Sequence, residues 1–155
     1  MAQFKEFSGT WILTENGGTN YDEYLQKIEI SWLDRFFAKH LGRKLEIQCT
    51  GENSFDLIDQ VDSCLLPFPA LPSYQEVIFG KTYQKTRKDG VILRRRYERR
   101  YSEGKYRGRI HCFESSDDLS AESVWELRDR NRLFVTINCE FSQFIKVRQV
   151  YTRIE

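Results

Sequence analysis

The sequence predicts an antiparallel up-and-down β-barrel of about nine or ten strands, preceded by a short helix hairpin. Segments of strand character recur every 8–14 residues after Gly42, with turn residues between them, whereas the apolar spacing before Gly42 is helical. The chain has 155 residues, of which 40% are hydrophobic and 14% aromatic, enough for one domain (1–155) with its own core. Side chains alone do not fill a barrel of this width, so the pattern also predicts a ligand cavity.

The N-terminal third begins with a strand and continues with two helices. Residues 10–14 are β-rich and end at the turn signal Asn16-Gly17-Gly18. Asn20 and Ser31 can each cap a helix, because an acidic residue stands three positions after each of them. Gly42 is well placed to end the second helix. We therefore expect a helical lid over about residues 20–42.

The rest of the chain consists of predicted strands in which apolar and polar residues alternate. Turn residues such as Asp89-Gly90 separate them, and three prolines mark an apolar loop at residues 67–72. The predicted strands cover residues 45–49, 55–61, 76–85, 91–100, 106–113, 123–128, 133–141 and 145–154.

The spacing of the cysteines, the first residues and the lack of a long apolar run argue against several classes of protein. The four cysteines, at positions 49, 64, 112 and 139, form no CxxC pair, and only two histidines are present, so no zinc site is predicted. We expect no secretory signal, because residues 1–7 lack an apolar segment and a cleavage site, and no run of 18 apolar residues occurs. We expect a cytoplasmic monomer with free thiols and without a metal or cofactor.

A net charge of +1 conceals a division between the two halves of the chain. Residues 1–80 hold 6 basic and 12 acidic side chains, and residues 81–155 hold 18 and 11. The densest basic run, residues 94–101, has two tyrosines interleaved with five arginines. This run is typical of a solvated or membrane-facing hairpin, and nucleic-acid binding is the alternative. Arg95 shares the parity of Val91, Leu93 and Tyr97, so it is the arginine of the run that we expect to point inward.

Several stretches share their order and spacing with a known family. Residues 7–11 read Phe-Ser-Gly-Thr-Trp, residues 21–25 read Tyr-Asp-Glu-Tyr-Leu, and residues 80–83 read Gly-Lys-Thr-Tyr. An Asp-Gly turn follows, and residues 147–153 close the chain. In this order they resemble the intracellular lipid-binding proteins, the fatty-acid-binding and cellular retinol-binding proteins of the calycin superfamily. The resemblance spans almost the whole chain apart from an insertion at about residues 63–74. It implies ten strands, a helix-turn-helix lid and a lipophilic ligand.

The resemblance also implies a head-group site, from which this chain departs. Fatty-acid binders hold a carboxylate with an Arg-x-Tyr pair on the last strand, and Tyr151 matches the tyrosine. Gln149 stands at the arginine position, as in retinol binders, while Arg148 lies one position out. The second family arginine falls at Trp125 or Glu126. An amide suits an uncharged group better than a carboxylate, so we predict a neutral lipophile bound by Gln149 and Tyr151.

Three interpretations of function follow, and the first is favoured. The chain is predicted to carry a lipophilic molecule without chemistry, with Trp125, Arg95 and Ile110 also lining its site, and Arg148 if a bulge turns it inward. Phe36 and the proline loop would form an apolar portal that touches anionic membranes transiently. A cofactor-independent oxygenase is the second interpretation, because residues 51–53 and 134–138 are similar to stretches of deep-sea shrimp luciferase. A basic face for nucleic acid or anionic membranes is the third.

Overall fold

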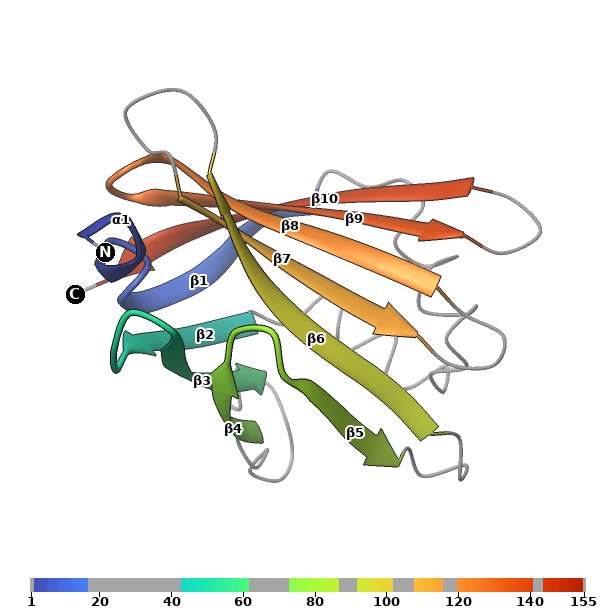
Figure 1. Cartoon of the computed structure of the whole chain (residues 1–155). Helices are drawn as coiled ribbons and strands as arrows, with labels where there is room; N and C mark the ends of the chain where they lie inside the picture. Colours follow the sequence, from blue (N-terminus) through green and yellow to red (C-terminus); the bar gives the residue numbers. More distant parts are fainter. Residues whose placement is uncertain are drawn as a thin grey trace.

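Ten antiparallel strands form one curled sheet, with a short helix at the N-terminus (Figure 1). The computed structural model describes residues 2–16, 43–61, 73–86, 92–101, 108–115, 120–140 and 144–154. The elements are α1 (Ala2–Lys5), β1 (Gly9–Asn16), β2 (Arg43–Cys49), β3 (Ser54–Val61), β4 (Ser73–Ile78), β5 (Thr82–Thr86), β6 (Ile92–Tyr101), β7 (Gly108–Ser115), β8 (Ser120–Asp129), β9 (Arg132–Glu140) and β10 (Phe144–Ile154). No helix in these ranges is long and apolar enough to cross a membrane.

The strand order confirms the predicted up-and-down topology. The hydrogen-bonded order is β4-β3-β2-β1-β10-β9-β8-β7-β6-β5. Strands that are adjacent in sequence are therefore neighbours in the sheet, except β4 and β5, and β1 also pairs with β10. The ten-stranded antiparallel sheet that the sequence predicted is therefore present. The predicted helical lid at residues 20–42 lies outside the described residues, as does the insertion apart from Ser73 and Tyr74.

One strand prediction was wrong. Residues 76–85 were predicted as one strand, but the structure divides them into β4 and β5. The division falls at Gly80, whose φ of 86° is a conformation that side chains rarely adopt. The Gly80 amide donates to the Tyr97 carbonyl oxygen at 2.8 Å. This bond connects the turn to β6, so the chain does not continue as one strand.

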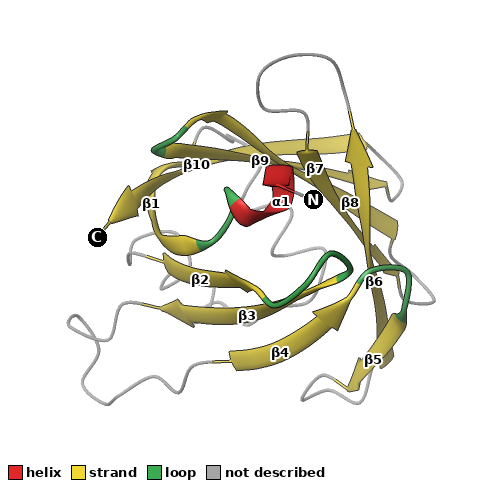
Figure 2. Cartoon of the chain, turned by 60° about the vertical axis from the view of Figure 1, so that its left-hand side comes forward, coloured by secondary structure: helices red, strands yellow, loops and turns green. Residues whose placement is uncertain are grey.

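The short helix α1, which the sequence analysis did not predict, lies at one end of the curled sheet (Figure 2). It lies against both β2 and β7, which belong to opposite walls of the sheet. Phe4 is buried there, with ring centroids 5.6 Å from Phe79 and 5.5 Å from Tyr101. The Phe4 carbonyl also accepts from the Cys49 thiol. This aromatic plug closes that end of the concave face.

The core lies on the concave face, where residues of alternate parity are buried. Three rings bridge the two walls: Phe55 of β3 lies 5.6 Å from Tyr97 of β6 and 6.5 Å from Trp125 of β8, between ring centroids. Tyr97 and Trp125 are 5.9 Å apart and nearly perpendicular. Such edge-to-face contacts add to the stabilisation from burial alone. They join β3 to β6 and β8 without a hydrogen-bonded ladder.

Arg153 joins the two ends of the chain. Its guanidinium donates to the carbonyl oxygens of Glu6, Ser8 and Arg130, and lies 4.3 Å from the centre of the Trp11 ring. The approach is so close that a β-carbon at Gly9 would collide with its Nη1 atom. Gly9 has a φ of 148°, so glycine satisfies both the conformation and the space at this point.

Candidate ligand-binding site

Gln149 of β10 is a fully buried polar side chain on the concave face. It is 1% exposed and pairs with Val135 of β9, which is also buried. Its Oε1 atom accepts from the Tyr151 hydroxyl at 3.2 Å. Its Nε2 atom has no hydrogen-bond partner in the described part of the chain. A buried amide without an acceptor costs about 1–3 kcal/mol, so this donor is ready for an acceptor from a ligand.

Trp125 and Ile110 lie on the same cross-strand row as this amide, and Tyr151 lies two residues from it along β10. Trp125 and Ile110 face each other across β8 and β7, and both are buried. Tyr151 is 1% exposed and pairs with Leu133 and Leu13 on its two neighbouring strands. The centre of the concave face therefore carries an apolar wall with one uncharged polar group.

A second polar group on the concave face is an ion pair. Arg95 of β6 and Glu114 of β7 lie directly opposite each other, and their Nη2 and Oε2 atoms are 3.2 Å apart. Both share the parity of Tyr97 and Cys112, which are buried. The side chains are nevertheless 33% and 16% exposed, so this part of the concave face is open. Burial acts to lower the pKa of Arg95, but Tyr97 and Glu114 outweigh it, so the net shift is upward and the guanidinium stays charged.

Tyr97 and Cys112 link the ion pair to the aromatic core. Burial raises the pKa of the Cys112 thiol to about 12, and burial also raises the pKa of Tyr97. Both groups are therefore neutral at physiological pH. The charge of Arg95 acts to lower the pKa of each group, but burial outweighs it. Cys112 is a free thiol, and no three metal-ligating side chains come together within the described ranges.

The two polar groups lie at different heights on the concave face. The ladder that contains Gln149 runs through Val135, Trp125 and Ile110 to Arg99 of β6. Arg95 is four residues from Arg99 along β6, which is roughly 13 Å at the strand rise. The ion pair lies toward the β7–β8 turn, away from α1. A ligand that lies against this face therefore meets an uncharged group and a neutralised pair at separate points.

One of the predicted site residues is not on this face. Arg148 is exposed and has the parity opposite to Gln149, and the β9–β10 register is continuous from Phe144 to Thr152. No bulge turns Arg148 inward, so the prediction that Arg148 lines the ligand site is wrong. Alternation along β10 directs its side chain away from the concave face. Phe36 lies outside the described residues. Glu114 was missed because the predicted strand ended at Phe113, although the alternation of Ile110 and Cys112 continues to it.

Arg96 and Arg100 of the basic run lie on the convex face and are paired with a carboxylate, whereas Arg99 shares the parity of Arg95 and donates to the Glu52 carbonyl oxygen. Arg96 and Arg100 both bridge to Glu98, and both guanidinium groups lie over the Phe113 ring at 5.1 and 5.7 Å. Arg109 bridges to Glu126 at 2.8 Å. These ion pairs offset part of the positive charge of this hairpin. They do not favour nucleic-acid binding.

The two stretches similar to shrimp luciferase lie in different environments. Residues 51–53 form the β2–β3 turn, and residues 134–138 lie in the middle of β9. Val135 and Ile137 of the second stretch are buried apolar side chains. Nothing in these positions favours the oxygenase interpretation.

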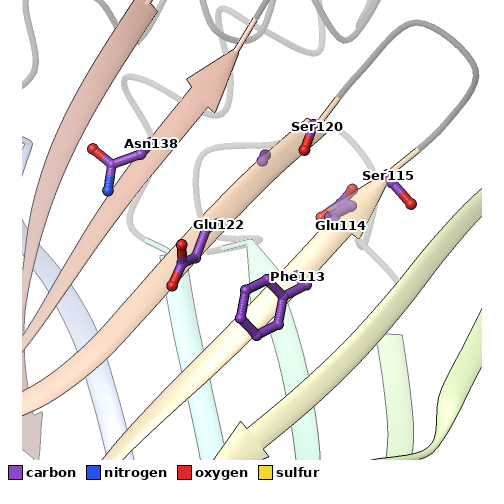
Figure 3. A pocket seen from close by; sticks show the side chains of 7 residues that line it. Phe113, Glu114, Ser115, Ser120, Glu122 and Asn138 are labelled. Atoms are coloured by element: carbon purple, nitrogen blue, oxygen red, sulfur yellow. The ribbon is translucent and has the colours of Figure 1, made fainter.

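A small pocket opens at the rim where β7, β8 and β9 adjoin (Figure 3). Its volume is about 380 Å³. Glu114 and Ala121 reach it from the concave side, whereas Phe113, Glu122 and Asn138 have the opposite parity. Glu122 is held by His111, whose Nδ1 atom is 2.7 Å from its carboxylate. Glu114 therefore lines this rim pocket and also forms the ion pair with Arg95.

Comparison with known proteins identifies the fold. No protein-family model matches the chain, and no curated protein is significantly similar in sequence. Among solved structures, the Schistosoma mansoni fatty acid binding protein in complex with arachidonic acid matches with a TM-score of 0.76 at 15% identity, over 99% of both chains. Fatty-acid-binding protein 1 of Echinococcus granulosus matches with a TM-score of 0.74 at 11% identity, over 97% of this chain and 98% of that one.

A third match has a different described property. The fluorescent protein UnaG has a TM-score of 0.72 at 17% identity, over 96% of this chain and 98% of its own. All three matches share the curled antiparallel sheet over nearly their full length. The chain therefore has the fold of the fatty-acid-binding proteins, as the sequence resemblance implied.

Proposed function

We propose that this chain is an intracellular lipid-binding protein that carries one small lipophilic molecule non-covalently against the concave face of its sheet. The fold supports this function at the level of the class, since proteins of this fold include described fatty-acid binders and a fatty acid transporter. The observation that carries it is the amide of Gln149, which is fully buried and whose Nε2 atom lacks an acceptor. A donor left unpaired in a core is costly unless a ligand completes it.

The preferred ligand is neutral, such as a long-chain alcohol or carbonyl compound. Gln149 and Tyr151 provide hydrogen bonds without charge, and Trp125 and Ile110 provide an apolar wall. In the described part of the chain no guanidinium group contacts the Gln149 side chain, so a carboxylate bound there would have no positive partner among these residues. An unpaired buried charge costs several kcal/mol or is removed by protonation, so the matching fatty acid should bind less tightly.

Paired titrations of a long-chain alcohol and its acid test this proposal. The wild type should bind the alcohol more tightly, and Gln149→Arg should shift the preference toward the acid, because a guanidinium offers two charge-assisted bonds. Gln48→Arg, at an exposed position on β2, is the matched control and should leave the preference unchanged. Tighter binding of the acid by the wild type would overturn the neutral-ligand proposal. Binding of neither probe would overturn the carrier function.

A further inference from the structure

The concave face carries a charged residue that the neutral site at Gln149 does not use. Arg95 points to the same side as the buried core, yet its only described ion pair is with Glu114. We propose that Glu114 determines the charge selectivity of the site, by occupying the guanidinium of Arg95 and so excluding ligands with an ionised acidic head group. This inference rests on the proposed function and deepens it by assigning a specificity-determining pair.

The position of the Arg95–Glu114 pair explains why it would select between charged and neutral ligands. Arg95 and Glu114 are cross-strand partners, and one-third of the arginine side chain is open to the space over the concave face. Glu114 also lines the rim pocket at the C-terminal end of β7 (Figure 3). A ligand that enters past this rim meets the carboxylate beside the guanidinium.

The charges around Arg95 are balanced without a ligand. Tyr97 and Cys112, two polar neighbours of the pair on this face, are neutral because burial raises the pKa of each, and Tyr83 of β5 is the other cross-strand partner of Arg95. Glu114 is therefore the one anion of this cluster in the described residues, and it matches the single positive charge of Arg95. An acid that approaches the guanidinium places a second carboxylate beside the first. One carboxylate must then lose its partner or take up a proton, and both outcomes weaken binding. An alcohol meets no such penalty.

Removal of the Glu114 charge should release Arg95 for an acidic ligand. Glu114→Gln keeps the size of the side chain and leaves an uncompensated guanidinium on the concave face. Charge-assisted hydrogen bonds are worth about 1.5–3 kcal/mol, so the acid should bind roughly ten- to hundredfold more tightly than to the wild type. Affinity for the alcohol should change by less than about threefold, because Gln149 and not Glu114 faces its head group.

Matched variants separate selectivity from structural damage. Glu114→Asp keeps the charge and should keep the wild-type preference for the alcohol. Glu122→Gln removes a carboxylate from the same rim pocket, but on the convex side, and should change neither affinity. Arg95→Met combined with Glu114→Gln removes the guanidinium and should cancel the gain for the acid. Glu114→Ser offers a second neutral side chain if Glu114→Gln does not fold.

The experiment is a set of calorimetric titrations with a long-chain alcohol and its acid at pH 8, with folding checked by circular dichroism. An acid-to-alcohol affinity ratio that rises at least tenfold in Glu114→Gln, and returns in the double variant, supports the proposal. If the wild type binds the alcohol but the ratio does not rise, the role of Glu114 is overturned and the carrier function stands. If Glu114→Gln binds the acid while the wild type binds neither probe, the role of Glu114 stands and the neutral-ligand carrier does not. If no protein binds either probe, both are overturned.

Discussion

Replacement of Gln149 by leucine should make the empty protein more stable and its ligand binding weaker. The side chain is fully buried, and its Nε2 atom has no partner among the described residues. Removal of this unpaired donor should recover about 1–3 kcal/mol of desolvation free energy. Loss of the hydrogen bond from the Tyr151 hydroxyl, which is 3.2 Å long, should cost about 0.5–1.5 kcal/mol. Leucine has nearly the same volume, so little cavity term is expected.

The two terms leave a net stabilisation of about 1 kcal/mol in the free energy of unfolding, or about 2–4 °C in Tm for a chain of this size. Urea unfolding of the ligand-free protein, followed by circular dichroism, measures the first quantity. A bound alcohol or carbonyl compound would lose one neutral hydrogen bond in the variant. Its affinity should therefore fall roughly three- to tenfold in a calorimetric titration.

The opposite signs of the two changes are the decisive feature. A residue that serves only the fold would lose stability on replacement and leave affinity unaffected. The reasoning is refuted if Gln149→Leu is destabilised by more than about 1 kcal/mol while the alcohol binds as before, since a structural hydrogen bond is worth about that much. Gln48→Leu, at an exposed position of β2, is the control and should change neither quantity.

Four further predictions concern the closure of the sheet, its thiol and its surface. Arg153→Met should lower the free energy of unfolding by about 2–4 kcal/mol, because three carbonyl contacts and the stacking on Trp11 are lost; a loss near zero in urea unfolding would contradict it. Gly9→Ala should cost about 1–3 kcal/mol from its φ of 148° and the contact with Arg153, and part of the cost should disappear in the Arg153→Met background. Stability should fall as pH rises from about 9 toward 12, because the folded state keeps the proton of Cys112 that the unfolded state releases, and Cys112→Ala should flatten this decline in pH-dependent urea unfolding. Transfer of a bound lipophile to vesicles should be faster with anionic lipid and slower with salt if the chain touches membranes; equal rates in a fluorescence transfer assay would remove that prediction.

Alternation along the strands was the part of the structure that the sequence predicted best. In the predicted strand 106–113, alternation of apolar and polar residues puts Ile110 and Cys112 on one face and Arg109 on the other, and the burial of these residues follows that alternation. The division of residues 76–85 was not predicted, because Gly80 in an otherwise strand-like run gives no sign of its positive φ. Sequence periodicity specifies faces reliably and ends of strands poorly.

In the candidate site, too, features set by alternation along one strand were predictable, whereas features set by pairing between strands were not. The position of Gln149 on the concave face follows from its spacing to Tyr151, and the exposure of Arg148 follows from the same alternation. The pair of Arg95 with Glu114 depends on the register between β6 and β7, in which residues nineteen apart face each other. That register is fixed by the connection between the two strands and by packing, neither of which a single sequence reveals. Whether these groups bind a ligand remains a prediction.

The sheet is continuous between β1 and β10, where the chain has its two ends, and interrupted between β4 and β5, where the chain runs on. Its hydrogen-bonded order begins at β4 and ends at β5, while the two chain termini meet through β1 and β10 (Figure 1). Between β4 and β5 the described contacts include a single side-chain bridge, in which the Ile78 amide donates to the Tyr83 hydroxyl at 2.8 Å. A circular permutant that joins the termini and opens at Lys81 would keep every ladder of the sheet. Its sequence order would then be the same as its strand order, with each strand formed beside the one before it.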